Sequence, residues 1–124
     1  MGTPTRSFID DRPEARRRVP RPWEQFEERF PFVVAAYESL RGACNEAGPL
    51  DKTTVALVKL AVSVGSGFER TVHIHATKAL RTGADPDALR QIVLIALPTI
   101  GLPAALDALR WVDESIREVA SNTT

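Results

Sequence analysis

Apolar residues recur at helical spacing along most of this chain. Between Trp23 and Val33 they fall three or four residues apart. Because an α-helix turns once in 3.6 residues, this spacing places them on one face and predicts helix. Pro31 interrupts the run, so we expect two helices that meet there. The second helix continues through an apolar stripe and is expected to end before Gly48-Pro49.

The segment between Leu57 and Val64 is apolar on nearly all sides. Its valines would also suit a β-strand. The whole run of about fourteen residues is longer than most strands, which favours a helix. Asp51 stands where a capping residue is expected, and Gly65-Ser66-Gly67 ends the run. We therefore predict a helix buried at the centre of the fold.

Three more helices are predicted towards the C-terminus. The first runs from about Phe68 to Thr82 and stops at Gly83, a residue type that favours helix ends. The second begins at Asp85-Pro86, with the acid as cap and proline in the first turn. An interruption is expected over 98–103, and a last helix over 103–120. The pattern contains no strand pair and no phosphate-binding loop, so we predict an all-α fold of about five or six helices.

The first residues differ in composition from the rest. Residues 1–22 hold six arginines, three acidic residues and four prolines, with few apolar groups. Such a segment cannot offset the entropy of ordering by burial. We expect residues 1–22 to form an exposed arm, 23–120 a helical domain, and 121–124 a frayed tail. A targeting or docking peptide, or a contact to nucleic acid, is the alternative for the arm.

Composition excludes several classes of protein. Sixteen basic residues balance sixteen acidic ones in the 124-residue chain, so no global positive field exists to bind nucleic acid. No apolar run approaches the roughly 20 residues of a membrane span. One cysteine rules out an internal disulfide, a CxxC pair and a cysteine-rich zinc site. The N-terminus lacks the apolar stretch of a secretory signal, which predicts a cytoplasmic protein.

Short helices that are apolar on several sides leave more apolar surface than one small bundle can cover. The neutral net charge does not oppose assembly. We therefore predict a homo-oligomer.

The chain has two histidines, His73 and His75, both within Val72-His73-Ile74-His75. On a helix, residues two apart point about 200° away from one another, so these rings are not expected to chelate one ion within a chain. A site completed by another subunit, with Glu69, remains an alternative. Glu69 lies four residues before His73, on a polar side of the helix, and His75 borders the apolar side. An imidazole titrates near neutral pH and can give or accept a proton.

Lys59 is the one ionised residue between Leu57 and Val64. Its long side chain can reach solvent past the apolar surface. It can also serve as a cation that binds a substrate carboxylate, or as a neutral amine in a dry pocket.

Five segments in order carry a resemblance. They are Leu50–Thr54, Lys59–Gly65, His75–Gly83, Asp85–Leu97 and Gly101-Leu102-Pro103. In combination they resemble the carboxymuconolactone decarboxylase family, also called alkylhydroperoxidase D-like. The resemblance implies an all-α fold that assembles as trimers or hexamers, with pockets near the subunit contacts.

The resemblance implies one of two chemistries. The peroxidase branch carries a CxxC pair and an upstream glutamate, and the matching positions here are Phe68, Thr71 and Ala56. Without a sulfur pair no thiol can be oxidised and resolved, which disfavours thiol peroxidase activity. The decarboxylase branch keeps one histidine, which matches His75. Acidic positions of that branch fall on Thr71 and Gln91.

These observations lead to one main hypothesis and two alternatives. The main hypothesis is acid–base chemistry, without metal or cofactor, that decarboxylates or isomerises a small organic acid or lactone. His75 would be catalytic, with His73 and Glu69 as a second polar pair. Substrate contacts are expected from Lys59, Thr71 and Thr99. The alternatives are a non-catalytic binding or assembly module and an oligomer-built metal site at His73 and His75.

Overall fold

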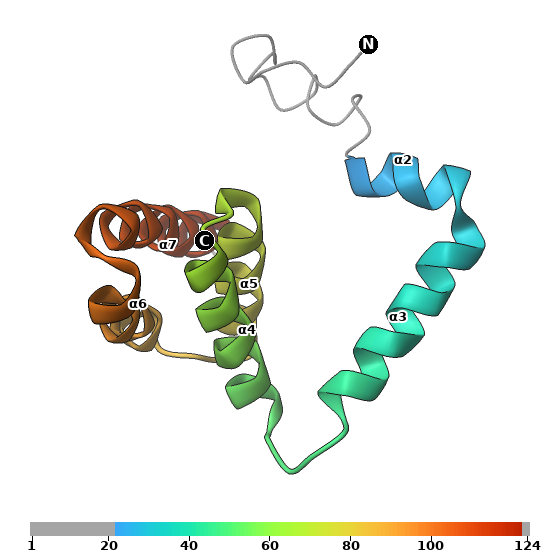
Figure 1. Cartoon of the computed structure of the whole chain (residues 1–124), viewed down its shortest axis with the longest axis horizontal. Coiled ribbons are helices and arrows are strands. Elements are labelled where there is room, and N and C mark those ends of the chain that lie inside the picture. Colours follow the sequence, from blue (N-terminus) through green and yellow to red (C-terminus); the bar gives the residue numbers. More distant parts are fainter. Residues whose placement is uncertain (1–21, 123–124) are drawn as a thin grey trace, which may run out of the picture. The chain divides into compact units, whose positions relative to one another are not determined.

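The computed structural model describes residues 22–122, and nearly all of them are helical (Figure 1). The helices are α2 (Pro22–Arg29), α3 (Pro31–Asn45), α4 (Lys52–Ser66), α5 (Glu69–Arg81), α6 (Pro86–Ile100) and α7 (Leu102–Asn122). No strand occurs within this range, which confirms the predicted all-α fold. The predicted arm lies outside the described residues except for Pro22. The chain divides after Ala47 into two units, which are described separately.

The first unit holds α2 and α3. Pro31 occupies the first turn of α3, where proline needs no hydrogen-bond partner, so the predicted break at this residue is confirmed. An aromatic contact links the two helices: the ring centroids of Trp23 in α2 and Tyr37 in α3 are 6.0 Å apart. Within α2, those of Trp23 and Phe26 are 5.9 Å apart. Among residues 22–47 only Val34 is buried, and the apolar stripe of α3 is exposed.

The second unit begins with a capped helix. The Asp51 carboxylate accepts a hydrogen bond from the Thr54 backbone N–H over 2.8 Å. Gly67 ends α4 in the left-handed region, with φ of 76°. Asp85 caps α6 in the same manner, accepting from the Asp87 N–H over 2.8 Å. Both predicted caps are confirmed, and the segment after Asp51 is a helix rather than a strand.

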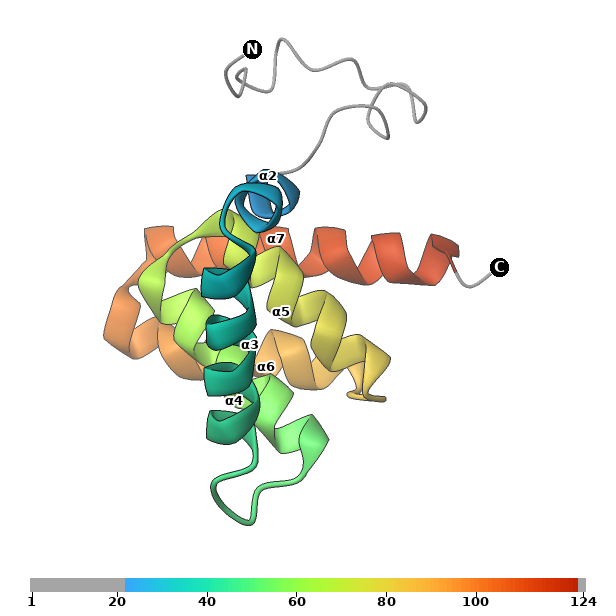
Figure 2. The ribbon, with the colours of Figure 1, turned by 90° about the vertical axis from the view of Figure 1, so that its right-hand side faces the viewer.

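The core of the second unit lies among α4, α5, α6 and α7, which pack as one bundle (Figures 1 and 2). Its fully buried apolar side chains include Leu60, Val72, Leu89, Val93 and Val112. The prediction that α4 is buried at the centre of the fold is wrong for this bundle, because Val58 and Val62 are exposed. Only one face of α4 meets its neighbours.

The connection between α6 and α7 is much shorter than predicted. Helix α6 continues through Pro98 to Ile100, and Gly101 alone separates it from α7. Gly101 has a φ of 92°, which side-chain-bearing residues rarely adopt. The interruption expected over 98–103 is therefore one residue long. Helix α7 also runs two residues past Ala120, into the segment predicted as a frayed tail.

None of the helices between residues 22 and 122 combines the length and the apolar character needed to cross a bilayer.

The cap of α4 supports a prediction on stability. Hydrogen bonds from Thr54, the backbone N–H first, hold the pKa of Asp51 below its ordinary value of 3.8. Because the folded state favours the ionised form, the cap stabilises the fold above that pH and loses its effect as the pH falls through the folded-state pKa. Asp51→Ala should lower the melting temperature at pH 7, and the difference from wild type should shrink below about pH 4. Thermal melts followed by circular dichroism test this.

The matched control is Glu118→Gln, which alters an exposed carboxylate on α7 whose own backbone oxygen, not its side chain, accepts from Ser121. If Asp51→Ala lowered the melting temperature by the same amount at every pH, the role assigned to the ionised cap would be contradicted.

Candidate functional site

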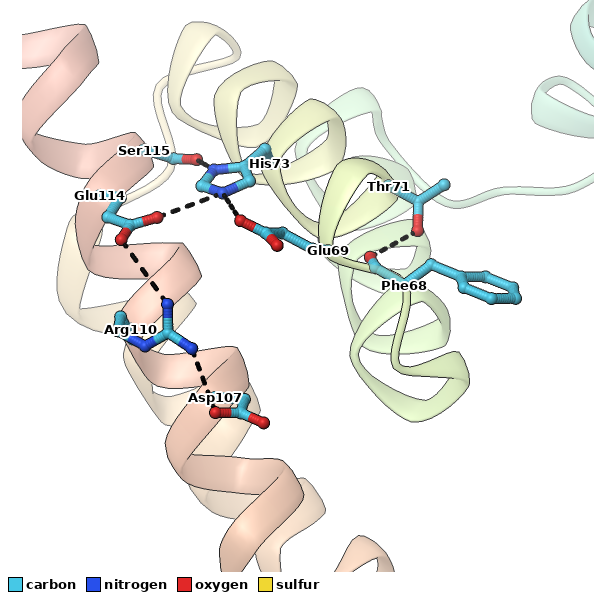
Figure 3. Close-up of polar contacts among 8 residues, drawn as sticks. All are labelled: Phe68, Glu69, Thr71, His73, Asp107, Arg110, Glu114 and Ser115. Carbon is cyan, nitrogen blue, oxygen red and sulfur yellow. Dashed lines mark hydrogen bonds and ion pairs between the residues drawn. The ribbon is translucent and has the colours of Figure 1, made fainter. Parts of the chain in front are cut away.

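A polar cluster lies where α5 and α7 pack together (Figure 3). We use this name for Glu69 and His73 of α5 with Glu114 and Ser115 of α7. Glu69 and His73 are one helical turn apart, so they share a face of α5. Glu114 and Ser115 are adjacent on α7 and reach the same imidazole from the other side. The predicted pairing of Glu69 with His73 is confirmed.

The His73 ring is held by a buried hydroxyl. Its Nδ1 lies 2.8 Å from Oγ of Ser115, a side chain with no exposed surface. A hydrogen bond of this length to one ring nitrogen fixes the orientation of the other. The Nε2 atom is thereby directed towards the two carboxylates.

Both carboxylates stand slightly beyond ordinary hydrogen-bond length from Nε2. Oε1 of Glu114 is 3.3 Å away and Oε2 of Glu69 is 3.5 Å away. The His73 side chain is 28% exposed, against 44% for Glu69 and 39% for Glu114. The cluster is therefore half-buried, and solvent screens its charges only in part.

Arginine compensates some of the negative charge. The guanidinium of Arg110 lies 3.9 Å from Oε2 of Glu114 and 3.2 Å from Oδ1 of Asp107. It therefore approaches the outer oxygen of Glu114, while the inner oxygen faces His73 (Figure 3). When the His73 ring is neutral, the charge of the two carboxylates beside it is balanced only in part. The balancing group is the Arg110 guanidinium, which also contacts Asp107.

The positions that match the peroxidase cysteines lie outside the polar cluster. Phe68 precedes α5 and its ring is exposed. The Thr71 hydroxyl donates to the Phe68 carbonyl over 3.0 Å, within the first turn of the helix (Figure 3). A phenyl ring and a hydroxyl cannot perform the thiol–disulfide cycle.

The remaining predicted residues lie on three helices. His75 is half-buried on α5, beside the buried Ala76. Lys59 is half-buried on α4, and its carbonyl accepts the Ser63 hydroxyl over 2.9 Å. Thr99 is exposed near the end of α6. Lys59 and His75 each interact with a neighbouring group, and none of the three residues belongs to the polar cluster.

Sequence reasoning missed both α7 members of the cluster. The sequence position of Ser115 could have indicated a buried contact. It is a polar residue three positions after Val112 and four before Val119, on the apolar side of the helix. A hydroxyl at such a position needs a buried partner. Glu114 gives no comparable signal, because charged residues are common on α7.

An open apolar groove of about 300 Å³ lies elsewhere, between α4 and α6. Its lining residues are Thr54, Leu57, Val58, Ala61, Ala88, Gln91, Ile92 and Ile95. The lining offers two polar side chains and no charge, so it suits an apolar occupant.

The sequence profile of the carboxymuconolactone decarboxylase family matches residues 31–114, more than half of the chain. The chain belongs to this family. The matched span runs from α3 into α7 and includes every predicted site residue as well as Glu114. No curated protein and no solved structure matches the chain. The resemblance drawn from the sequence is thus confirmed at the level of the family.

The buried contact to His73 gives a second prediction on stability. Ser115→Ala removes the buried hydroxyl that pairs with Nδ1 of His73 and leaves that ring nitrogen without this hydrogen-bond partner. We expect the free energy of unfolding to fall by about 1–2 kcal/mol. Urea denaturation followed by circular dichroism measures this.

Ser121→Ala is the control on the same helix. It removes an exposed hydroxyl that donates to the Glu118 carbonyl and should leave stability nearly unchanged. Equal stabilities for the two variants would show that the Ser115 contact contributes nothing.

Proposed function

We propose that this member of the carboxymuconolactone decarboxylase family catalyses decarboxylation or isomerisation of a small organic acid or lactone, with His75 as the proton-transfer group. The observation that carries the proposal is the family match over residues 31–114, together with Phe68 and Thr71 in place of a thiol pair. Proton transfer by an imidazole needs neither sulfur nor redox partner. A half-buried ring such as that of His75 can be screened from bulk water and still be reached by a substrate.

The proposed reaction divides between a cation and a proton donor. Lys59, half-buried on the helix that packs against α5, would hold the substrate carboxylate. In a β-keto or β,γ-unsaturated acid the bond to the carboxylate breaks, CO₂ leaves, and the electron pair moves into the adjoining π system. Protonated His75 then delivers its proton to carbon. Thr71 and Thr99 supply hydroxyls for further hydrogen bonds to the substrate.

Charge favours His75 over His73 as the centre for an acidic substrate. Glu69 and Glu114 lie within 3.5 Å of Nε2 of His73, and they would repel a carboxylate placed there. In this proposal His73 and Glu69 form a second polar pair outside the anion-binding part of the site.

Substitution of His75 tests the assignment. His75→Gln keeps an amide of similar size but cannot transfer a proton at neutral pH, so kcat on an accepted substrate should fall at least 100-fold. Loss of ultraviolet absorbance of unsaturated acids and lactones, with CO₂ release, follows turnover. Lys59→Met should mainly raise KM, because it removes the cation that binds the substrate carboxylate.

Lys78→Gln, an exposed change on the same helix, is the control and should keep wild-type kinetics. Full turnover in His75→Gln would remove His75 from the mechanism. A wild-type chain that binds such acids without converting them would favour the alternative of a binding module.

We also propose that the protein acts as a homo-oligomer, a trimer or a hexamer, built on the apolar side of α4 and α6. Val62 and Ile95 are each 67% exposed there, and the apolar groove lies between the two helices. Apolar side chains so exposed on neighbouring helices are typical of surfaces that a partner covers. A second copy of the chain is the occupant that this proposal names.

A charge placed on this surface should break the assembly. Val62→Asp should lower the mass in sedimentation equilibrium to that of a single chain, because an aspartate resists burial against apolar neighbours. Lys52→Asp, an exposed change in the first turn of α4, should leave the mass unchanged. A wild-type mass of 13.6 kDa, that of one chain, would contradict the proposal.

A further inference from the structure

We propose that Glu69, His73 and Glu114 bind one divalent transition-metal ion, with Zn²⁺ as the best match, between α5 and α7. Within residues 22–122 these three side chains form the group whose ligand atoms all lie within 4.8 Å of one another. The site is separate from the proposed chemistry at His75, and neither proposal depends on the other.

The spacing of the donor atoms fits a metal better than it fits hydrogen bonds. Two ligands of a tetrahedral Zn²⁺ at about 2.0–2.1 Å from the ion lie about 3.3 Å apart. Nε2 of His73 is 3.3 Å from Glu114 Oε1 and 3.5 Å from Glu69 Oε2. Both distances exceed the usual 2.7–3.2 Å of an N–H···O bond. The ligand atoms of all three side chains lie within 4.8 Å of one another, so side-chain movements would be needed to bring them all to an ion.

The donor set selects the class of ion. One imidazole nitrogen and two carboxylate oxygens suit Zn²⁺ and its first-row neighbours. Calcium and magnesium prefer oxygen ligands alone and take more of them. Three protein ligands leave a fourth position for water, and the partial exposure of both carboxylates gives that position access to solvent.

Ser115 prepares His73 for this role. Nδ1 lies 2.8 Å from the buried Oγ. In the tautomer whose Nδ1–H donates to this hydroxyl, the lone pair of the neutral ring lies on Nε2, which faces the carboxylates. Metal-binding histidines commonly donate their second N–H to such a partner, which fixes the tautomer. The sequence spacing of two histidines on α5 did not point to this arrangement, because its third ligand comes from α7.

The local charge also favours a cation. Glu69 and Glu114 approach one imidazole from two helices, and Arg110 reaches only the outer oxygen of Glu114, at 3.9 Å. A divalent ion at the inner oxygens would neutralise the remaining charge. It would also join α5 to α7 by coordination bonds in addition to packing.

Calorimetric titration of the full-length, chelator-stripped protein with Zn²⁺ tests the proposal. We expect about one ion per chain with micromolar or tighter affinity. Glu114→Gln and His73→Gln should each weaken binding at least 10-fold. The matched controls are Glu118→Gln, one turn further along α7, and His75→Gln, and both should bind Zn²⁺ like wild type.

A second measurement needs no variant at the site. In wild-type protein, Zn²⁺ should shift the ¹⁵N resonance of His73 Nε2 and leave the ring of His75 unshifted. Wild-type affinity weaker than millimolar, or equal binding by wild type and Glu114→Gln, would overturn the proposal. Loss of binding in His75→Gln would also overturn it, because the site would then involve both histidines.

The two proposals fail separately. His75→Gln that loses turnover but keeps Zn²⁺ is the result expected if both hold. A Zn²⁺ site without turnover refutes only the acid–base proposal, and turnover without Zn²⁺ binding refutes only the metal site.

Discussion

The close packing of α5 on α7 is the constraint on which the rest of the second unit depends. The buried positions of α5 are Val72, Ala76 and Ala79, and those of α7 are Ala105, Ala108, Val112 and Ser115. Small side chains at such positions let two helices approach closely. Because the contact is close, a short serine side chain can reach the imidazole of His73. A larger residue on either face would separate the hydroxyl from the ring.

Several helix starts and breaks were predictable from the sequence. Asp51, Asp85 and Pro31 act through groups within a few residues of themselves, so their effects follow from spacing alone. The pairing of Glu69 with His73 was predictable for the same reason. Pro98 was misjudged because α6 continues through it, and the chain turns instead at Gly101. The one-sided burial of α4 was missed because an apolar run does not say which partner covers each side.

Only half of the polar cluster could be predicted from the sequence. The spacing of the helical repeat predicts that Glu69 and His73 lie on one face of α5. The α7 members come some forty residues later in the chain, and their position depends on where α5 and α7 cross. The pairwise geometry of a crossing is set by packing and not by local pattern. The composition of α7 marks Ser115 as unusual on an apolar face, and the structure supplies its partner.

The two histidines give α5 two different sides. Residues two apart on a helix point about 200° away from each other, so one helix can serve two environments. The side of His73 faces the carboxylates of Glu69 and Glu114. The side of His75 lies beside the buried row of α5. In the two proposals made above, α5 therefore presents one side to a metal cation and another side to an acidic substrate.

The one-residue connection at Gly101 couples the rotation of α7 to that of α6. Each residue inserted or deleted between Gly101 and Glu114 would turn the later part of α7 by about 100° and shift it by about 1.5 Å. Such a change would carry Ser115 and Glu114 away from the His73 ring while the apolar face of α7 left the core. The segment from Gly101 to Ser115 is therefore expected to keep a constant length among chains that retain the polar cluster.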